Sequence, residues 1–195
     1  MFTILPIKGY IDQIDGFFCD GIHAGLKPNG NNDLGFIYTK EACTVAAIFT
    51  ENRFQAAPLK HFLAYEEGFK TNFVLINSKN ANALTGRKGI EDINTLFSKL
   101  NFDLINPIMS STGVIGNRLP IEKLVTGALK FDLTAKSGEN LSRAIMTTDA
   151  YPKSCLYEVK LEDGSSFKIG AVAKGAGMIN PNLATMLCFI CTDAV

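Results

Sequence analysis

The sequence predicts a mixed α/β or α+β protein, in which strands and amphipathic helices alternate along 195 residues. Short apolar runs rich in β-branched residues alternate with segments whose apolar residues recur at helical spacing. The chain is also 47% apolar and 19% charged, so it can build a sizeable buried core. No linker, repeat or low-complexity tract divides it. We therefore expect a single domain over residues 1–195, with a strand order that one sequence does not fix.

Strands and helices alternate in the first half of the chain. Two short apolar runs, Thr44–Phe49 and Asn72–Ile76, contain β-branched residues and predict buried strands. Between them, a helix is expected to begin at Pro58, because proline favours the first helical turn, and to end at Gly68. Residues 90–104 carry apolar side chains at helical spacing, with charges on the other side. That pattern predicts a second, amphipathic helix.

The second half continues with a short strand, Ile108–Ser110, and a third helix from Pro120 through Leu129. Apolar and charged residues then alternate from Tyr157 to Ile169, and Asp163-Gly164 interrupts them, which predicts a β-hairpin with a tight primed turn. The last stretch, Thr185–Thr192, is nearly all apolar. It predicts a strand that is buried on both faces.

Charge and composition argue against several classes of partner. Nineteen basic residues balance nineteen acidic ones, so we expect neither nucleic acid nor an anionic membrane as a partner. No apolar run approaches the ~20 residues that span a bilayer, and the amino terminus does not resemble a signal peptide. Five scattered cysteines do not make a disulfide framework. Reduced thiols and a cytoplasmic location are expected.

Few side chains suit histidine or metal chemistry. Only His23 and His61 are present, and neither has a recognisable catalytic setting, so a histidine-based triad is not favoured. The C-x-x-C pattern of Cys188 and Cys191 lies in an apolar run without a second pair. We interpret these two cysteines as small buried hydrophobic residues and expect no metal site.

Three segments could carry chemistry by other means. Ser110–Gly116 and Lys174–Met178 are glycine-containing and could bind an anion through backbone N–H groups. Neither matches a phosphate or dinucleotide motif, so ordinary turns are the simpler local interpretation. Thr185 taken alone is only the first residue of a strand. If the bond before it were cut, however, its freed α-amine could act as the base for its own hydroxyl.

The segment Lys174–Leu187 closely resembles the self-cleavage motif of the ornithine acetyltransferase family, the bifunctional glutamate N-acetyltransferases. Five more segments resemble this family in the same order: Gly21–Lys27 with Asp33–Leu34, Ala46–Thr50 with Ala56–Pro58, Asn77–Ala83 with Thr85–Gly86, Ser111–Gly116, and Ile145–Asp149 with Pro152–Lys153. Six ordered motifs across essentially the whole chain outweigh the simpler local interpretations. The resemblance implies a layered helix–sheet–sheet–helix sandwich, shared with a group of self-processing aminopeptidases.

The resemblance also implies a mechanism. The Ala184–Thr185 bond would be cut autocatalytically, and Thr185 would carry an acetyl group from N2-acetylornithine to glutamate in arginine biosynthesis. No cofactor is implied, although some family members also use acetyl-CoA as the donor. The matching positions are Thr112 and Gly113 for the oxyanion hole, and Lys174, Thr185 and either Thr147 or Thr148 for substrate contacts, with Thr147 favoured.

By the same resemblance, residues 1–184 correspond to an α chain and residues 185–195 to the start of a β chain, whose remainder is absent. The implied partner is that β chain, in an assembly of two α and two β chains, and this polypeptide alone is expected to be an incomplete catalyst. Lys79 departs from the family pattern, which has glycine there. Two alternatives stay open: a self-processing aminopeptidase or amidase of the same fold, and a non-catalytic truncated chain.

Overall fold

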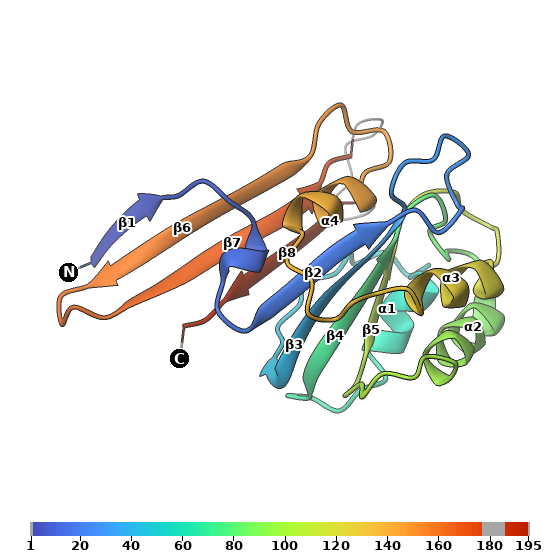
Figure 1. Ribbon diagram of the computed structural model, residues 1–195. Helices are drawn as coiled ribbons and strands as arrows, with labels where there is room; N and C mark the ends of the chain where they lie inside the picture. Colours follow the sequence, from blue (N-terminus) through green and yellow to red (C-terminus); the bar gives the residue numbers. More distant parts are fainter. Residues whose placement is uncertain (1, 177–185, 195) are drawn as a thin grey trace.

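The computed structural model describes residues 2–176 and 186–194 and has a mixed α/β fold with two four-stranded sheets (Figure 1). The elements in chain order are β1 (Phe2–Pro6), the 3-10 helix η1 (Ile11–Gln13), β2 (Phe17–Ile22), β3 (Leu34–Thr44), α1 (Ala57–Phe62), β4 (Lys70–Asn77), α2 (Gly86–Ser98), β5 (Ile108–Ser111), α3 (Ile121–Ala128), α4 (Gly138–Ala144), β6 (Lys153–Leu161), β7 (Ser166–Lys174) and β8 (Leu187–Thr192). One sheet has the order β1-β6-β7-β8 and is antiparallel. The other has the order β2-β3-β4-β5, in which only β4 and β5 pair in parallel.

The β2-β3-β4-β5 sheet is covered on both faces (Figure 1). Phe36 and Ile37 are neighbours on β3, so they point to opposite faces, and both are buried. Phe36 packs in a core with α2 and α3, whereas Ile37 packs in a second core with α4 and the β6-β7-β8 strands. Burying one such side chain contributes about 1.5–3 kcal/mol. The sheet is thus held between a helical layer and the other sheet.

Most of the predicted elements are confirmed, with shifted ends. The helix expected from Pro58 to Gly68 is α1, which ends earlier, at Phe62. The helix expected over residues 90–104 is α2, which starts earlier, at Gly86. Strands β4 and β5, helix α3 and the β6–β7 hairpin lie where their patterns place them.

The strand predicted at Thr44–Phe49 is wrong. Strand β3 ends at Thr44, and Ile48 beyond it is 84% exposed. The true strand was hidden partly by Gly35, which weakens a strand pattern. A Cβ at Gly35 would lie 2.7 Å from Leu141 of α4, so the glycine allows this helix to pack closely on the sheet. Strands β1 and β2 and helix α4 were also not predicted.

The turn of the β6–β7 hairpin also differs from the prediction. A type I′ turn needs positive φ at both central residues and a type II′ turn needs it at the first, but here only the second residue, Gly164, has it, at +87°. The Gly164 N–H donates to the Leu161 carbonyl at 3.1 Å, and the Leu161 N–H donates to the Ser165 carbonyl at 2.9 Å. Asp163 Oδ1 accepts from the Ser165 N–H at 2.9 Å. The hairpin is therefore closed by a longer loop that ends in a left-handed glycine.

Strand β8 is not buried on both faces, contrary to the prediction. Cys191 is buried on the side of the other sheet, but Ile190 is 68% exposed and Cys188 is also exposed. Within residues 2–176 and 186–194, no helical layer covers this side of the β1-β6-β7-β8 sheet, so three of the four expected layers are present. The described helices include none that is long and apolar enough to cross a membrane.

Candidate active site at the ends of the strands

Three strand ends meet at one edge of the β2-β3-β4-β5 sheet. Strands β2, β4 and β5 run in the same direction, because β3 is antiparallel to β2 and β4, and β5 is parallel to β4. The segments that follow these strands therefore begin at a common edge, and that edge is where open α/β sheets bind ligands. They contain residues 23–33, 78–83 and 112–116. Two of the predicted site residues, Thr112 and Gly113, lie in the last segment.

Thr112 and Gly113 are held against the segment that follows β4. The Thr112 side chain is buried, and its N–H donates to the Asn77 carbonyl at 3.0 Å. The Val114 N–H donates to the Lys79 carbonyl at 2.9 Å. Because the Thr112 N–H is already used, the groups that this pair can present to a ligand are the Thr112 hydroxyl and the Gly113 N–H.

Asparagine side chains lock the 78–83 segment in place. Asn80 donates its amide to the Asn117 and Arg118 carbonyls at 3.2 and 3.0 Å and accepts from the Asn82 N–H at 2.7 Å. Asn82 is fully buried and donates to the Gly89 carbonyl at 3.0 Å. The amide side chains thus supply hydrogen bonds that this irregular backbone cannot make with itself. In the sequence these asparagines stand out only as part of the family resemblance, and no local pattern indicates their positioning role.

Lys79, the departure from the family pattern, has a left-handed backbone with φ +77°. Glycine adopts this conformation freely, whereas a residue with a Cβ is strained in it. The Lys79→Gly variant should therefore raise the free energy of unfolding by about 0.5–1 kcal/mol, which chemical denaturation of the whole protein will measure. The control is Lys60→Gly in the interior of α1, which should lower it by about 1 kcal/mol. Equal losses in the two variants would contradict the strain at Lys79.

A buried carboxylate organises the segment that follows β2. Asp33 is fully buried and accepts backbone N–H groups from Ala24, Leu26 and Lys27 at 2.6, 2.7 and 2.7 Å. The Asp33 carbonyl in turn accepts from the Ser78 N–H at 2.9 Å. The 23–33 and 78–83 segments are therefore fixed to each other.

The same edge connects to the end of α4 and to β7. Ser78 is fully buried, and its hydroxyl donates to the Ala144 carbonyl at 2.7 Å. Beyond α4, the Thr147 N–H donates to Asp149 Oδ2 at 3.2 Å. Asp149 Oδ1 accepts from the Gly175 N–H at 2.7 Å, next to Lys174. Hydrogen bonds, together with the short backbone stretch from Ala144 to Thr147, thus connect the strand ends of the β2-β3-β4-β5 sheet to the residue after Lys174.

Lysines surround the Asp149 carboxylate. Lys153 donates to Asp149 Oδ1 at 2.7 Å. Lys174 is 4% exposed; burial lowers the pKa of its ammonium group, and the charge of Asp149 acts in the opposite direction. Burial also lowers the pKa of Lys27, again opposed by Asp33 and Asp149. This cluster is suited to bind a carboxylate ligand. Lys174 was predicted as a site residue from the family motif, whereas Lys27 and Asp149 were not, because no local pattern brings the three together.

Asp149→Asn should lower the free energy of unfolding by about 1.5–3 kcal/mol at neutral pH. Burial raises the pKa of Asp149, but hydrogen bonds from Lys153, Gly175 and Thr147 outweigh it and the pKa is lowered. A lowered folded-state pKa stabilises above the unfolded pKa, and this contribution is lost as the pH falls through the folded value. The difference between wild type and variant should therefore shrink in urea titrations as the pH falls below the unfolded pKa of about 3.9.

The control for this prediction is Asp163→Asn in the hairpin turn. The hydrogen bonds of Ser165 lower the pKa of Asp163 as well, but that side chain is exposed and pairs only within its own turn. Its replacement should leave stability nearly unchanged. A pH-independent difference between wild type and Asp149→Asn would show that the charge of Asp149 is not what stabilises the cluster.

The structure also shows the surroundings of the other candidate residues, His61, Cys188 and Cys191. His61 is buried in α1 against Tyr65 and Phe97, with ring centroids 5.4 and 6.0 Å away, and burial lowers its pKa. Cys188 and Cys191 lie on opposite sides of β8, so they cannot chelate one metal ion, and the interpretation of both as buried is wrong for Cys188. Among the described residues, no cluster of three metal-ligating side chains is found.

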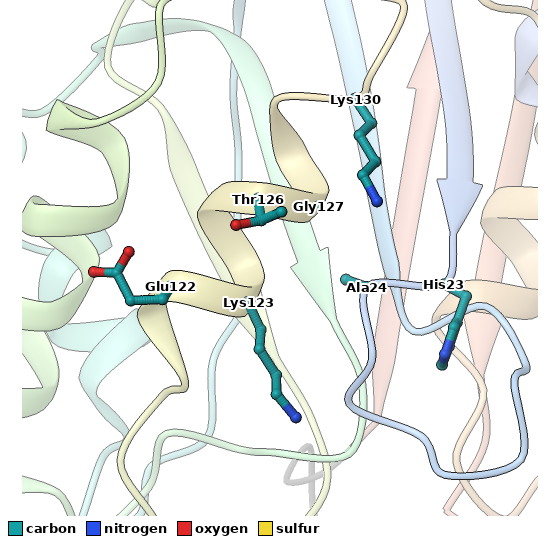
Figure 2. Close-up of a pocket in the computed structure, with 7 residues that line it drawn as sticks. All are labelled: His23, Ala24, Glu122, Lys123, Thr126, Gly127 and Lys130. Carbon is teal, nitrogen blue, oxygen red and sulfur yellow. The ribbon is translucent and has the colours of Figure 1, made fainter.

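A groove of about 260 Å³ lies between α3 and the segment that follows β2, and Figure 2 shows the residues around it. It is lined by His23, Ala24, Glu122, Lys123, Thr126, Gly127 and Lys130. Lys123 Nζ donates to the Gly25 carbonyl at 3.2 Å beside it. None of the predicted site residues among those described lines this groove, although His23 and Ala24 belong to the segment that follows β2 at the same sheet edge. Ala184 and Thr185 lie outside the described residues.

The protein has two packed four-stranded sheets, and polar loops lie together at one edge where strands end. The comparisons with known proteins show that this mixed α/β fold is of the ArgJ type. The chain belongs to the ArgJ family, whose pattern matches residues 18–195. The resemblance to ornithine acetyltransferases is thereby confirmed.

Its relatives include the arginine biosynthesis bifunctional protein ArgJ of Wolinella succinogenes, 53% identical over all of this chain and 50% of that protein. A relative from Uncinocarpus reesii, described as mitochondrial, is 40% identical over 92% of this chain and 44% of its own length. The chain thus spans about half the length of the curated relatives it matches.

Two solved structures share the fold. The crystal structure of ArgJ from Bacillus halodurans has a TM-score of 0.83 and 33% identity, over 95% of this chain and 99% of that chain. The ornithine complex of ornithine acetyltransferase from Mycobacterium tuberculosis has a TM-score of 0.75 and 30% identity, over 93% of this chain and 100% of that chain.

Proposed function

We propose that the whole protein is a glutamate N-acetyltransferase of arginine biosynthesis, which moves an acetyl group from N2-acetylornithine to glutamate through Thr185. The observation that carries this proposal is the connection of the Thr112 loop, Thr147 and the end of β7 by hydrogen bonds and by the short backbone stretch from Ala144 to Thr147. Leu187, which follows Thr185 by two residues in the sequence, pairs with Lys174. The family and the ornithine-bound relative support the substrate class.

Self-cleavage comes first in the proposed mechanism. Thr185 Oγ attacks the Ala184 carbonyl carbon, the Ala184–Thr185 C–N bond breaks, and an ester to Thr185 forms. Water hydrolyses that ester, which leaves a carboxylate on Ala184 and a free α-amine on Thr185. Two findings about relatives agree with a division of the chain. This chain covers only about half of the curated relatives but 99% and 100% of the chains in the two solved structures.

Acetyl transfer then proceeds in two steps. The α-amine of Thr185 takes the hydroxyl proton as Oγ attacks the acetyl carbonyl of N2-acetylornithine, and the amide bond breaks with release of ornithine. The amine of glutamate attacks the acetyl ester, which forms N-acetylglutamate and restores the Thr185 hydroxyl. In both steps, the Thr112 hydroxyl and the Gly113 N–H stabilise the oxyanion, and each donor contributes about 3 kcal/mol.

In this proposal, the lysines around Asp149 recognise the substrate. Lys174 pairs with the α-carboxylate that acetylornithine and glutamate share, and Asp149 holds the adjoining backbone in position. A threonine of the Thr147–Thr148 pair makes a further contact, with Thr147 preferred because its backbone is fixed by Asp149. Acetyl-CoA is proposed as a second donor, and two α and two β chains as the assembly.

The test uses the whole protein, purified and incubated with N2-acetylornithine and glutamate. We expect N-acetylglutamate in the product mixture and an acetyl adduct on Thr185 by mass spectrometry when glutamate is left out. Parallel samples contain amino-acid amides instead, to detect an aminopeptidase. Amide hydrolysis without acetyl transfer would replace the proposal by the aminopeptidase alternative, and the absence of both activities would favour a non-catalytic chain.

A further inference from the structure

Lys79 keeps a strained backbone conformation beside the loop that contains Thr112 and Gly113. Its φ of +77° is left-handed, a conformation that glycine adopts freely and that strains a residue with a Cβ. Asn82 in the same segment is also left-handed, at +46°, but asparagine tolerates this conformation, and its amide donates to the Gly89 carbonyl. Strained residues cluster at functional sites, where the strain is part of how the site works. The strain at Lys79 therefore points to a role for its side chain.

The Lys79 side chain offers a charge and no polar contact. It is exposed, and its ammonium group makes no hydrogen bond or ion pair with the residues that the structure describes. The Lys79 carbonyl does accept the Val114 N–H at 2.9 Å, but a glycine carbonyl would accept it equally well. What distinguishes lysine from glycine at this position is therefore its positive charge.

This charge stays close to the proposed oxyanion donors. A Cβ on Gly113 would overlap the Lys79 carbonyl carbon, so the two backbones are in contact. A lysine ammonium group lies at most about 6 Å from its own Cα, so wherever this side chain points, its charge remains within about 12 Å of Gly113. The Debye length is about 10 Å at 0.1 M ionic strength. The charge of Lys79 therefore acts on a ligand in the site at low salt and is screened at high salt.

The two proposed substrates differ in net charge. N2-acetylornithine has one carboxylate and one ammonium group and is neutral overall, whereas glutamate has two carboxylates and one ammonium group and is a net anion. In both transfer steps, the oxyanion and the protonated α-amine of Thr185 form together, so the reacting atoms gain no net charge. A cation beside the site therefore favours glutamate. The zero net charge of the chain as a whole provides no such attraction.

We propose that Lys79 is a specificity-determining residue for the acetyl acceptor: its charge speeds the capture of glutamate by the acetylated enzyme and leaves the reaction with N2-acetylornithine unchanged. This inference rests on the proposed function and adds acceptor selection to it. For unit charges about 10 Å apart in a solvated site, the attraction corresponds to a two- to fourfold change in rate at low salt. The strained backbone is retained because glycine, which relieves the strain, carries no charge.

Three variants of the whole protein separate the charge from the strain. Lys79→Gln loses the charge and keeps the strain, Lys79→Gly loses both, and Lys79→Arg keeps both. We expect kcat/KM for glutamate to fall about two- to fourfold in the first two variants and to be retained in Lys79→Arg. The value for N2-acetylornithine should stay the same in all three. Raising the ionic strength from about 0.05 M to about 0.5 M should lower kcat/KM for glutamate more in the wild type than in Lys79→Gln.

The matched control is Lys70→Gln, at the start of strand β4. Lys70 is also exposed, but it is separated from the other end of this strand by about 23 Å, well beyond the Debye length. Its replacement should change neither kcat/KM value. An unchanged value for glutamate in Lys79→Gln, or equal losses for both substrates, would overturn the inference and leave the transferase function in place. A wild-type protein without acetyl transfer would overturn both.

Discussion

Thr185→Ala in the whole protein should leave one uncut polypeptide and lower acetyl transfer by about 10⁴-fold or more. Alanine lacks the hydroxyl that attacks the Ala184 carbonyl, so no new amino terminus forms. The same change removes the oxygen that would carry the acetyl group, so the loss does not depend on cleavage alone. A denaturing gel, amino-terminal sequencing and the rate of N-acetylglutamate formation measure the two effects.

Two controls separate nucleophile chemistry from a general effect of the substitution. Thr185→Ser keeps a hydroxyl and should still be cut and active, at a reduced rate. Thr192→Ala removes a different threonine hydroxyl, which donates to the Lys168 carbonyl at 2.8 Å, and should be cut and active like the wild type. An uncut wild-type protein that transfers acetyl groups would rule out the self-cleavage mechanism.

Local sequence patterns predicted the elements that are formed by residues close together in the sequence. Helices α2 and α3 have apolar residues at helical spacing, and the β6–β7 hairpin pairs residues 6 to 20 positions apart, from Lys160 with Ser166 to Lys153 with Ala173. Strand β3 was misplaced because the close packing of α4 requires Gly35, which disguises the strand. The alternation of β6 and β7 was read correctly, but it could not say which side faces another layer.

The candidate site was predictable from a resemblance and not from local patterns. Thr112, Gly113 and Lys174 were found by matching motifs, because a glycine turn or a lysine in isolation has many ordinary explanations. The groups that hold them in place were missed. Ser78 reaches Ala144 across 66 positions of the sequence, and Asp149 reaches Gly175 across 26. Such contacts depend on the topology of both sheets, which no single motif encodes.

After the nucleophile, the oxyanion loop should be the most sensitive part of the site. Gly113 has φ +131°, and a Cβ there would overlap the carbonyl carbon of Lys79. The Gly113→Ala variant must therefore separate the two loops, break the contact between Val114 and Lys79, and displace the Gly113 N–H from the oxyanion. We expect acetyl transfer to fall by about 10²–10³-fold per folded molecule, together with a lower melting temperature.

Gly116→Ala distinguishes this effect from backbone strain alone. Gly116 also has a positive φ, +89°, but its Cβ would meet nothing within 4 Å. Its replacement should cost about 1–2 kcal/mol of stability through strain and leave transfer per folded molecule close to wild type. Stability from chemical denaturation and activity normalised to folded protein should therefore separate the two variants. Equal losses of normalised activity would mean that the close approach of Gly113 to Lys79 does not position an oxyanion donor.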